Sequence, residues 1–545
     1  MDSHKKNTKM SEFFLRTESI KTDDIYNLSV ISESDESILQ ALGANEPCLL
    51  EGSRGTGKSF LMRLSELEIE KVGSKDISVF VTFNKSSLIT TEDPLQFYHW
   101  MLAKTLKALS TKLRKKGFAV SNLAANLLSN DINEENVAVE VDLKEIVRLF
   151  EGSYKEKSEI NISSLPDIED IKEAIQSICE ENEINRVFFF FDEAAHVFRP
   201  EQQRQFFSLF KDLRSPYITC NAAIYPGVTH FGESFELIHD CIHKTLDRNI
   251  SDSGYLDYFR NIVMKQADNA LKNKIETNAE LFNTLALSCG GNPRMLLRTL
   301  QDIKKWQTTP VDAVIKDFYR DNIWSEHTEL GEKYEGHRLI IDWGREFLEK
   351  KVIPNIETYN ETRREKSLDQ STIYFWVHKD SPMVVKEALR LLTYTGIIRK
   401  VDSSVRATRS ELGTRYEVKY GCIISLKSNP HSESKTFYNN LTIRKFPEFG
   451  KNSLSYEGSE NILIDNEDEN YERSLRSLLQ KSIDVLGLLT TWQKGRLHSA
   501  NIHTIGELYQ TTEDELIRNI SGIGEVRSRK IKNAVDSEIV EYISG

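Results

Sequence analysis

GSRGTGKS, residues 52–59, matches the phosphate-binding pattern GxxxxGK[ST] at every defined position. The apolar stretch CLLE precedes it and FLMRLSELEIE follows it, so the motif lies between a predicted strand and a predicted helix. Glycines let such a loop wrap closely around phosphates, with backbone N–H groups and the helix N-terminus directed at the negative charge. The sequence therefore predicts a phosphate cradle made of Gly52, Ser53, Arg54, Gly55, Thr56, Gly57, Lys58 and Ser59.

Two residues of this motif have predicted roles of their own. Lys58 is expected to neutralise the β- and γ-phosphates of a nucleotide. Ser59 is expected to place its hydroxyl on Mg²⁺, a hard cation that prefers oxygen ligands. ATP and Mg²⁺ are the predicted cofactors.

A second acidic element follows a strongly apolar run. Residues 187–191 read VFFFF and are followed directly by Asp192 and Glu193, which is typical of a buried strand that ends in two carboxylates. Asp192 is predicted to hold the Mg²⁺ shell, and Glu193 to polarise the attacking water as a general base. Both carboxylates together favour hydrolysis of the nucleotide over binding alone.

The surrounding sequence predicts an α/β fold. Short apolar stretches alternate with longer helical ones from residue 25 to residue 322, which indicates a mostly parallel sheet flanked by helices. Residues 129–164 are rich in Asn, Glu, Lys and Ser and are predicted to form a helical insertion. The predicted strands are 47–50, 77–83, 186–191 and 217–225.

Residues 288–294, SCGGNPR, introduce a predicted helix about a hundred residues after Glu193. A complete phosphate-binding loop, an apolar strand ending in Asp-Glu and a GxPR helix start resemble the AAA+ P-loop ATPases of the origin-recognition initiator type. The resemblance implies a helical lid whose sensor 2 arginine contacts the γ-phosphate, and it places that arginine at Arg294. A solvated arginine in a helix-capping loop is the alternative.

The same resemblance implies two further functional residues whose positions stay open. A polar sensor 1 residue should lie at the end of the strand 217–225. Asn221 fits by residue type, whereas Tyr225 and Thr229 fit the strand end better. Arg248 lies where an arginine finger is expected, although an ordinary surface arginine is the more common case in such a position.

After the lid, residues 383–400 form a predicted amphipathic helix ending at a glycine, and residues 415–425 alternate as a strand. This order resembles a winged helix, which follows the lid in origin-recognition ATPases. A helix in the major groove and basic residues on the wing would bind a duplex. Protein contact or domain packing is the alternative use of this region.

The last part of the chain, residues 483–535, resembles the C-terminal domain of the bacterial RNA polymerase α subunit and related helix-hairpin-helix folds. NIHTIGEL at 501–508 and GIG at 522–524 carry the likeness. In such folds a GxG turn presents N–H groups to a DNA phosphate, with basic residues on the next helix. The implied DNA contacts are Gly522, Gly524, Arg527, Arg529 and Lys530, with Lys532 also on that helix.

This module departs from the polymerase pattern at one place. Trp492 and Gly495 stand where the family has an arginine and an asparagine that enter the minor groove. Phosphate contact survives that change more easily than base readout. A protein-interaction role, including docking to a transcription complex, is therefore retained as an alternative.

These observations predict a modular chain. The parts are a flexible N-terminus (1–24), an AAA+ P-loop core (25–245), a helical lid (246–322), a winged-helix-like domain (323–428), a strand and loop region with an acidic linker (429–472) and an all-α helix-hairpin-helix module (473–545).

Composition limits the function. The net charge of -12 argues against a chain that coats nucleic acid with its whole surface, so any contact must be local. The N-terminal segment does not resemble a secretory signal, and no stretch is apolar enough to span a membrane, which predicts a cytoplasmic protein. The cysteines are scattered without a CxxC pair and are expected to be reduced: Cys48, Cys179, Cys220, Cys241, Cys289 and Cys422.

Two functions fit the sequence best. The first is a nucleotide switch in which ATP binding and hydrolysis reposition the C-terminal modules on double-stranded DNA. The second is an ATPase sensor or scaffold of a bacterial antiphage defence system, which forms homo-oligomers and recruits a separate effector. A transposition regulator is also permitted, whereas a helicase is disfavoured because no second RecA-like lobe is evident.

Overall fold

The computed structural model describes residues 13–118, 143–155, 165–463 and 475–544, except 72, 90, 92, 197, 228–229, 233, 369 and 461. The chain forms two compact units. The N-terminal unit consists of Phe14–Asp247 and Asn261–Gln266. The C-terminal unit consists of Met1–Phe13, Arg248–Arg260 and Ala267–Gly545.

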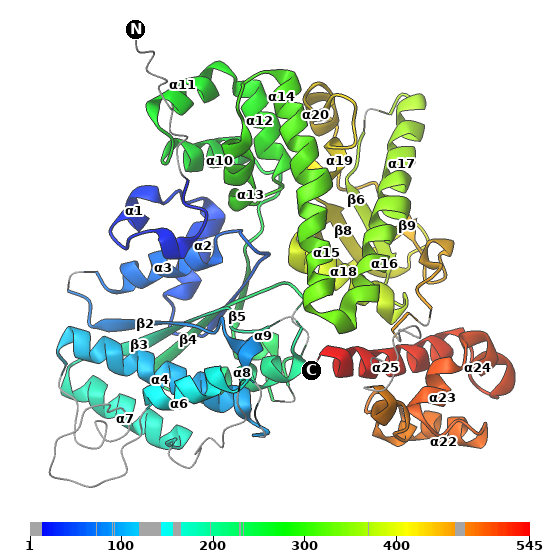
Figure 1. The fold of residues 1–545 in the computed structure, drawn as a ribbon, viewed down its shortest axis with the longest axis horizontal. Helices are drawn as coiled ribbons and strands as arrows, with labels where there is room; N and C mark the ends of the chain where they lie inside the picture. The colour runs from blue at the N-terminus through cyan, green and yellow to red at the C-terminus, as the bar shows by residue number, and fades with distance from the viewer. Residues whose placement is uncertain are drawn as a thin grey trace. The chain divides into compact units, whose positions relative to one another are not determined.

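The N-terminal unit is built on a five-stranded sheet in which every pairing is parallel (Figure 1). The strand order is β2-β3-β4-β1-β5. The parallel α/β sheet predicted from the sequence is confirmed, with one strand more than expected. The strands are β1 (Cys48–Glu51), β2 (Asp76–Thr82), β3 (Arg186–Asp192), β4 (Ile218–Ile224) and β5 (Ile242–Thr245).

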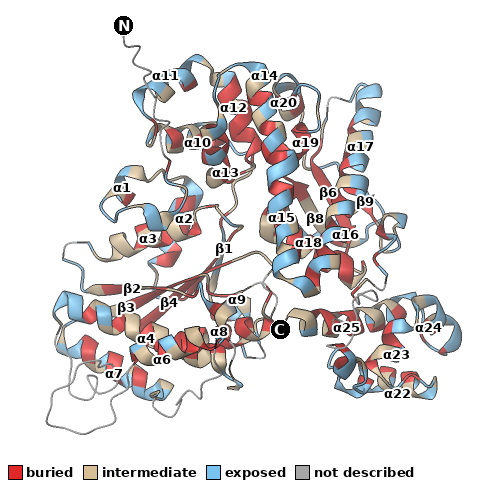
Figure 2. Cartoon of the chain, in the orientation of Figure 1, coloured by how far each residue is buried: buried red, intermediate tan, exposed pale blue. Residues whose placement is uncertain are grey.

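Strand β3 lies between two separate hydrophobic cores, one on each face of the sheet. Phe189 and Phe191 pack into the core on one face of the sheet, and Phe188 and Phe190 pack into the core on the other. This alternation follows from the period of two in a strand. Figure 2 shows β3 as buried, which explains why its sequence is a continuous apolar run.

The neighbouring strands and the covering helices supply most of the other side chains of the two cores. On the Phe189 face the helices are α4 (Gln96–Lys116), α6 (Leu143–Gly152), α7 (Ile168–Glu181) and α8 (Pro200–Asp212). On the Phe190 face they are α2 (Glu33–Leu42) and α3 (Lys58–Ile69).

Helix α6 agrees with the helical insertion predicted for 129–164. Residues 129–142 and 156–164 of that insertion lie outside the described residues, as do 1–12 of the predicted flexible N-terminus and 464–472 of the predicted linker.

The C-terminal unit begins with helices. A four-stranded sheet follows, in the order β7-β8-β6-β9. After α10 (Tyr255–Met264), which begins in this unit, its helices include α11 (Asn269–Thr277), α12 (Ala279–Ser288), α13 (Pro293–Asp302), α14 (Thr308–Lys316), α15 (Ile323–Lys333), α16 (Arg338–Phe347), α17 (Ile353–Glu365) and α18 (Met383–Thr395). The strands are β6 (Tyr374–His378), β7 (Ile398–Arg406), β8 (Leu412–Val418) and β9 (Glu448–Phe449).

Two local predictions in this unit need correction. The strand predicted for 415–425 ends at Val418, and Tyr420–Ile424 forms the short helix α19. A Cβ at Gly421 would lie 2.5 Å from the carbonyl oxygen of Ser288, so α19 packs closely on α12, a contact between distant segments that the local sequence pattern does not reveal. Residues 430–439 form helix α20 (Pro430–Asn439), where strands and loops were expected.

Helix α18 does end at a glycine as predicted. Gly396 has a φ of +75° and caps the helix in the left-handed conformation. Residues 398–400, which the prediction included in the helix, instead begin β7.

Short helices form the end of the chain. They are α22 (Thr491–Ser499), α23 (Ile505–Gln510), α24 (Glu513–Asn519) and the longer α25 (Glu525–Ser544). Three of them start with a capping box, in which Thr490, Thr504 and Thr512 accept the N–H of the third helical residue. These boxes satisfy backbone N–H groups at the starts of the short helices and so stabilise them. No described helix has the length and apolar character needed to cross a membrane.

Candidate nucleotide-binding site

The predicted phosphate loop joins β1 to the N-terminus of α3, as the motif requires. Gly55 and Gly57 have φ values of +88° and +106°, which only glycine adopts without strain. A Cβ at Gly52 would lie 2.9 Å from Thr56 Oγ1 and 3.3 Å from Leu246, so a side chain there would fill the loop. Backbone conformation therefore favours glycine at positions 55 and 57, and close packing favours it at position 52.

The side chain of Lys58 points into this loop. Its ammonium donates to the carbonyl oxygens of Gly52, at 2.5 Å, and Ser53, at 3.1 Å. It also lies 4.4 Å from the centre of the Tyr225 ring, and the residue is buried. A buried ammonium needs polar or aromatic partners, and the loop provides them at the place where a phosphate would be bound.

The other loop residues are arranged around this ammonium. Thr56 is buried and donates its hydroxyl to the carbonyl of Ser53 at 2.9 Å, which closes the loop on itself. Ser59 is half-buried in the first turn of α3, and the side chain of Arg54 is exposed.

The strand order brings the two carboxylates to the same edge of the sheet as the loop. The strands are parallel, so β1, β4 and β3 all end there, with β4 in the middle. Asp192 is buried at the tip of β3 and accepts the N–H of Glu193 at 2.9 Å. Glu193 has a φ of +53°, a strained conformation for a residue with a side chain.

Electrostatics links Glu193 to the loop. Burial raises the pKa of Glu193, and the charge of Asp192 raises it further. The positive charges of Arg54 and Lys58 act in the opposite direction but do not prevail. The structure thus brings together Lys58, Arg54, Asp192 and Glu193, which the sequence had predicted as parts of one site.

For the sensor 1 position, the structure separates the three candidates. Asn221 lies in the middle of β4, is buried and donates to the carbonyl of Leu42 at 2.8 Å. Tyr225 follows the end of β4 and contacts the ammonium of Lys58. Thr229 lies outside the described residues. Tyr225 is therefore the candidate that the geometry places at the site.

The two arginines implied by the resemblance belong to the C-terminal unit. Arg294 is the second residue of α13, a helix capped by the side chain of Asn292 and started by Pro293. Arg248 is half-buried, with its guanidinium 4.7 Å from the centre of the Tyr258 ring. The sensor 2 and arginine-finger roles stay predictions.

The residues present fit a nucleotide with Mg²⁺. The glycines leave room for phosphates in the loop. A side chain at Gly52 would take up part of that space, because its Cβ would already contact Thr56. The hydroxyl of Ser59 and the carboxylate of Asp192 are oxygen donors, which suit a hard divalent cation.

The predicted DNA-contacting residues are divided between two environments. Gly522, Gly524, Arg527 and Lys530 are exposed at the turn between α24 and α25 and on the first turns of α25. Arg527 donates to the carbonyl of Gly522 at 2.6 Å and lies over the ring of Trp492. Their DNA contacts stay predictions.

Arg529 is engaged within the chain. It donates to the carbonyl oxygens of Asp380 and Lys451, each at 2.9 Å, and forms an ion pair with Glu513. Its side chain is 13% exposed. Sequence reasoning missed this role, because an arginine after a GxG turn has the same local pattern whether it contacts DNA or protein.

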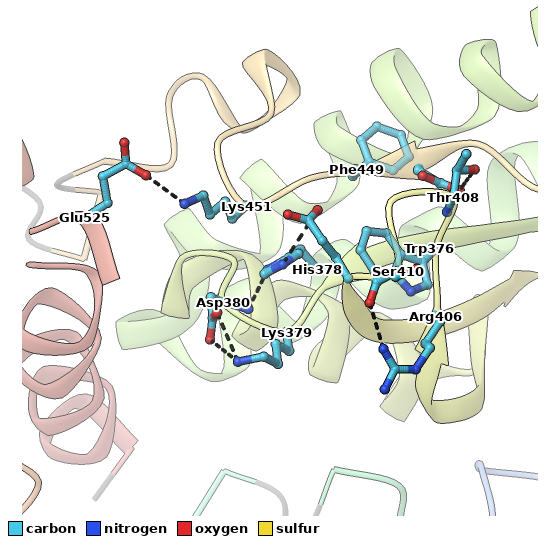
Figure 3. A network of polar contacts seen from close by, with 12 residues as sticks. Trp376, His378, Lys379, Asp380, Arg406, Thr408, Ser410, Phe449, Lys451 and Glu525 are labelled. Atoms are coloured by element: carbon cyan, nitrogen blue, oxygen red, sulfur yellow. Dashed lines mark hydrogen bonds and ion pairs between the residues drawn. The ribbon is translucent and has the colours of Figure 1, made fainter. Parts of the chain in front are cut away.

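Further contacts hold α25 against the region of β6 and β9. Lys451 pairs with Glu525 at 2.7 Å, and Met383 donates its N–H to the side chain of Asn533. Figure 3 shows the Lys451–Glu525 pair beside the polar residues at the end of β6, where Asp380 donates its N–H to His378. The C-terminal helices are thus fastened to the four-stranded sheet by specific polar contacts.

Comparison with known proteins gives little further information. No protein-family model matches the chain, and no curated protein matches it. A solved structure to which it is similar is the Orc1 protein of Aeropyrum pernix in complex with DNA, at 12% sequence identity. The match covers 75% of this chain and 98% of that one, with a TM-score of 0.29.

The contacts of Arg529 lead to a first prediction. Arg529→Ala removes hydrogen bonds to Asp380 and Lys451 and leaves those carbonyls to water, so α25 should separate more readily from the four-stranded sheet. Hydrogen exchange is expected to become faster in α25 and around residue 380. Arg518→Ala, an exposed arginine on α24, is the matched control and should leave the exchange unchanged. Unchanged exchange in Arg529→Ala would show that the arginine does not hold the module.

Proposed function

We propose that this chain is an ATPase of the P-loop class. The observation that supports the proposal is the meeting of Lys58 with Asp192 and Glu193 at the carboxyl edge of one parallel sheet. A cation on a glycine loop binds phosphate, and a carboxylate of raised pKa is suited to accept a proton. No other described cluster of the N-terminal unit combines these two features.

In this mechanism the loop N–H groups and the ammonium of Lys58 hold the phosphates of ATP. Transfer of the ammonium from the carbonyls of Gly52 and Ser53 to phosphate oxygens exchanges neutral acceptors for charged ones. Mg²⁺, held by Ser59 and Asp192, would neutralise the charge that develops on the phosphate oxygens.

Glu193 then accepts a proton from the attacking water. Its raised pKa makes it a stronger base than an ordinary carboxylate. Its strained backbone is held by the hydrogen bond from its own N–H to Asp192. Tyr225, in contact with Lys58, is placed to respond when the ammonium moves to phosphate.

The proposal extends to DNA through the C-terminal module. Arg527 and Lys530 are exposed beside the turn that contains Gly522 and Gly524, and such groups contact phosphates without reading sequence. In this account ATP binding and hydrolysis change how the module meets double-stranded DNA, and Arg294 of the lid relays the state of the γ-phosphate.

One observation favours a second function. Arg529 is used to fasten the module to the rest of the chain, and Trp492 is 43% exposed where the polymerase-like pattern has a DNA-binding arginine. These features suit a module that contacts protein. In that case the chain is an ATP-dependent sensor or scaffold of a defence system, which forms homo-oligomers and recruits an effector.

Steady-state ATPase activity separates the two proposals. Wild-type protein should hydrolyse ATP, and Lys58→Ala should lose that activity. If the module acts on DNA, a duplex should stimulate turnover at low salt, with the stimulation disappearing as salt rises because phosphate contacts release counterions. Lys58-dependent turnover that no duplex changes at any salt concentration would favour the sensor. An active Lys58→Ala protein would contradict both.

The pKa of Glu193 gives a pH prediction. Arg54 lowers that pKa, so Arg54→Gln should raise it further. Since Glu193 must be deprotonated to act, kcat/KM falls as the pH drops through its pKa, and this acid limb should move to higher pH in the variant. Arg148→Gln changes an exposed arginine on α6 and is the control for net charge. An acid limb that stays in place, or moves to lower pH, would contradict the role of Glu193.

A further inference from the structure

Strand β2 forms one edge of the five-stranded sheet, since it pairs with β3 and ends the strand order. Phe83, just after the strand, donates its N–H to the carbonyl of Asp192 in the neighbouring β3 segment. Ser78 instead donates its N–H to the carboxylate of Glu70 at 3.0 Å. The backbone N–H and C=O groups of successive strand residues point to opposite edges of the strand. Those of Ser78, Phe80 and Thr82 therefore point away from β3, toward the open edge.

This open edge lies in a groove of about 430 Å³. The groove is lined by residues 79–82 of β2, by Arg63 and Glu66 of α3 and by lysines of α4. Helices α3 and α4 both pack against β2, and they lie on opposite faces of the sheet (Figure 1). The groove is therefore a channel along the strand edge with a helix on either side.

The channel is strongly basic. Its lining includes five cationic side chains and the single carboxylate of Glu66, in a chain whose net charge is -12. The cations are Arg63, Lys104, Lys107, Lys112 and Lys115. A local positive channel on an acidic protein attracts an acidic ligand selectively.

Three of the five cationic side chains already form ion pairs with carboxylates of the same unit. Arg63 pairs with Glu66, Lys104 with Glu151 and Lys112 with Glu70, at distances of 2.7, 3.1 and 2.6 Å. Within the described part of the chain, no ion pair engages Lys107 or Lys115. These two lysines lie on α4 two turns apart, so they extend along the channel and present charge over the length of several strand residues.

Two further contacts define the shape of the channel, one at Phe80 and one at Ser78. The guanidinium of Arg63 lies 3.5 Å from the centre of the Phe80 ring, which fixes both side chains. Glu70 occupies the edge at Ser78, so the open backbone begins at Phe80 and continues to Thr82. A ligand that pairs with this edge must itself offer alternating N–H and C=O groups.

We propose that the groove at the open edge of β2 is a docking site for an acidic, extended peptide segment of a partner protein, which pairs with Phe80 and Thr82 as a sixth strand. Main-chain hydrogen bonds supply the pairing, and the lysines of α4 select acidic side chains. A nucleic acid would be attracted by the same charges but offers no backbone that matches a strand edge. The proposal is independent of ATP hydrolysis.

The competing explanation is that the lysines only keep the edge from pairing with other proteins, a common use of edge lysines. Binding decides between the two. The probe is a fluorescein-labelled peptide of alternating glutamate and valine, titrated into the full-length protein at low salt. A second peptide with proline in place of the central valine keeps the charge but loses a strand N–H.

The acidic peptide should bind, and both the proline peptide and Lys107→Glu/Lys115→Glu should weaken binding at least tenfold. Lys304→Glu/Lys305→Glu, which changes two exposed lysines elsewhere to the same extent, should bind as the wild type does. Lys107→Gln/Lys115→Gln should give an intermediate loss, which shows that charge and not misfolding is responsible. Bound peptide should slow hydrogen exchange at Phe80 and Thr82.

Three results would overturn the proposal. The first is no binding of the acidic peptide to the wild-type protein. The second is equal binding of the proline peptide, since attraction by charge alone does not require a strand. The third is displacement of the peptide by single-stranded oligothymidylate without slowed exchange at Phe80 and Thr82, which would make the groove a nucleic-acid site.

Discussion

The double-sided burial of β3 is the constraint on which the N-terminal unit depends. Phe188 and Phe190 fill one core while Phe189 and Phe191 fill the other, so the strand must lie inside the sheet with helices on both faces. Asp192 is the last residue of this strand and Glu193 follows it directly, so both carboxylates lie at the carboxyl edge of the sheet. The same parallel arrangement brings the phosphate loop after β1 and Tyr225 after β4 to that edge.

At this edge, opposing electrostatic effects act on the pKa of Glu193. Burial and the neighbouring charge of Asp192 raise the pKa of Glu193, and they outweigh the lowering by Arg54 and Lys58. Each pKa unit corresponds to about 1.4 kcal/mol between the two protonation states. In the mechanism proposed here, a carboxylate with a raised pKa at this position is the group that accepts the proton of the attacking water.

The sequence predicted the parts whose local pattern has one physical explanation. The loop glycines and the VFFFF run are of this kind, because positive φ values and double-sided burial leave few alternatives. Prediction was wrong for Tyr420–Ile424, whose apolar pattern fits a strand or a helix equally, and it missed β5, which is short and half-exposed. The contacts of Arg529 and the open edge at Phe80 depend on segments far apart in the chain, so no local pattern could reveal them.

The central claim is that Glu193 performs a chemical step at a site that binds ATP through Lys58. The most direct test compares Glu193→Gln with the wild type, using calorimetric titration with Mg·ATP for binding and a single-turnover assay for hydrolysis. Glu169→Gln, an exposed carboxylate on α7, is the control. The account predicts ATP affinity within a few-fold of the wild type and hydrolysis slower by about 10²–10⁴-fold, the usual contribution of a general base. Hydrolysis at the wild-type rate in Glu193→Gln would contradict it.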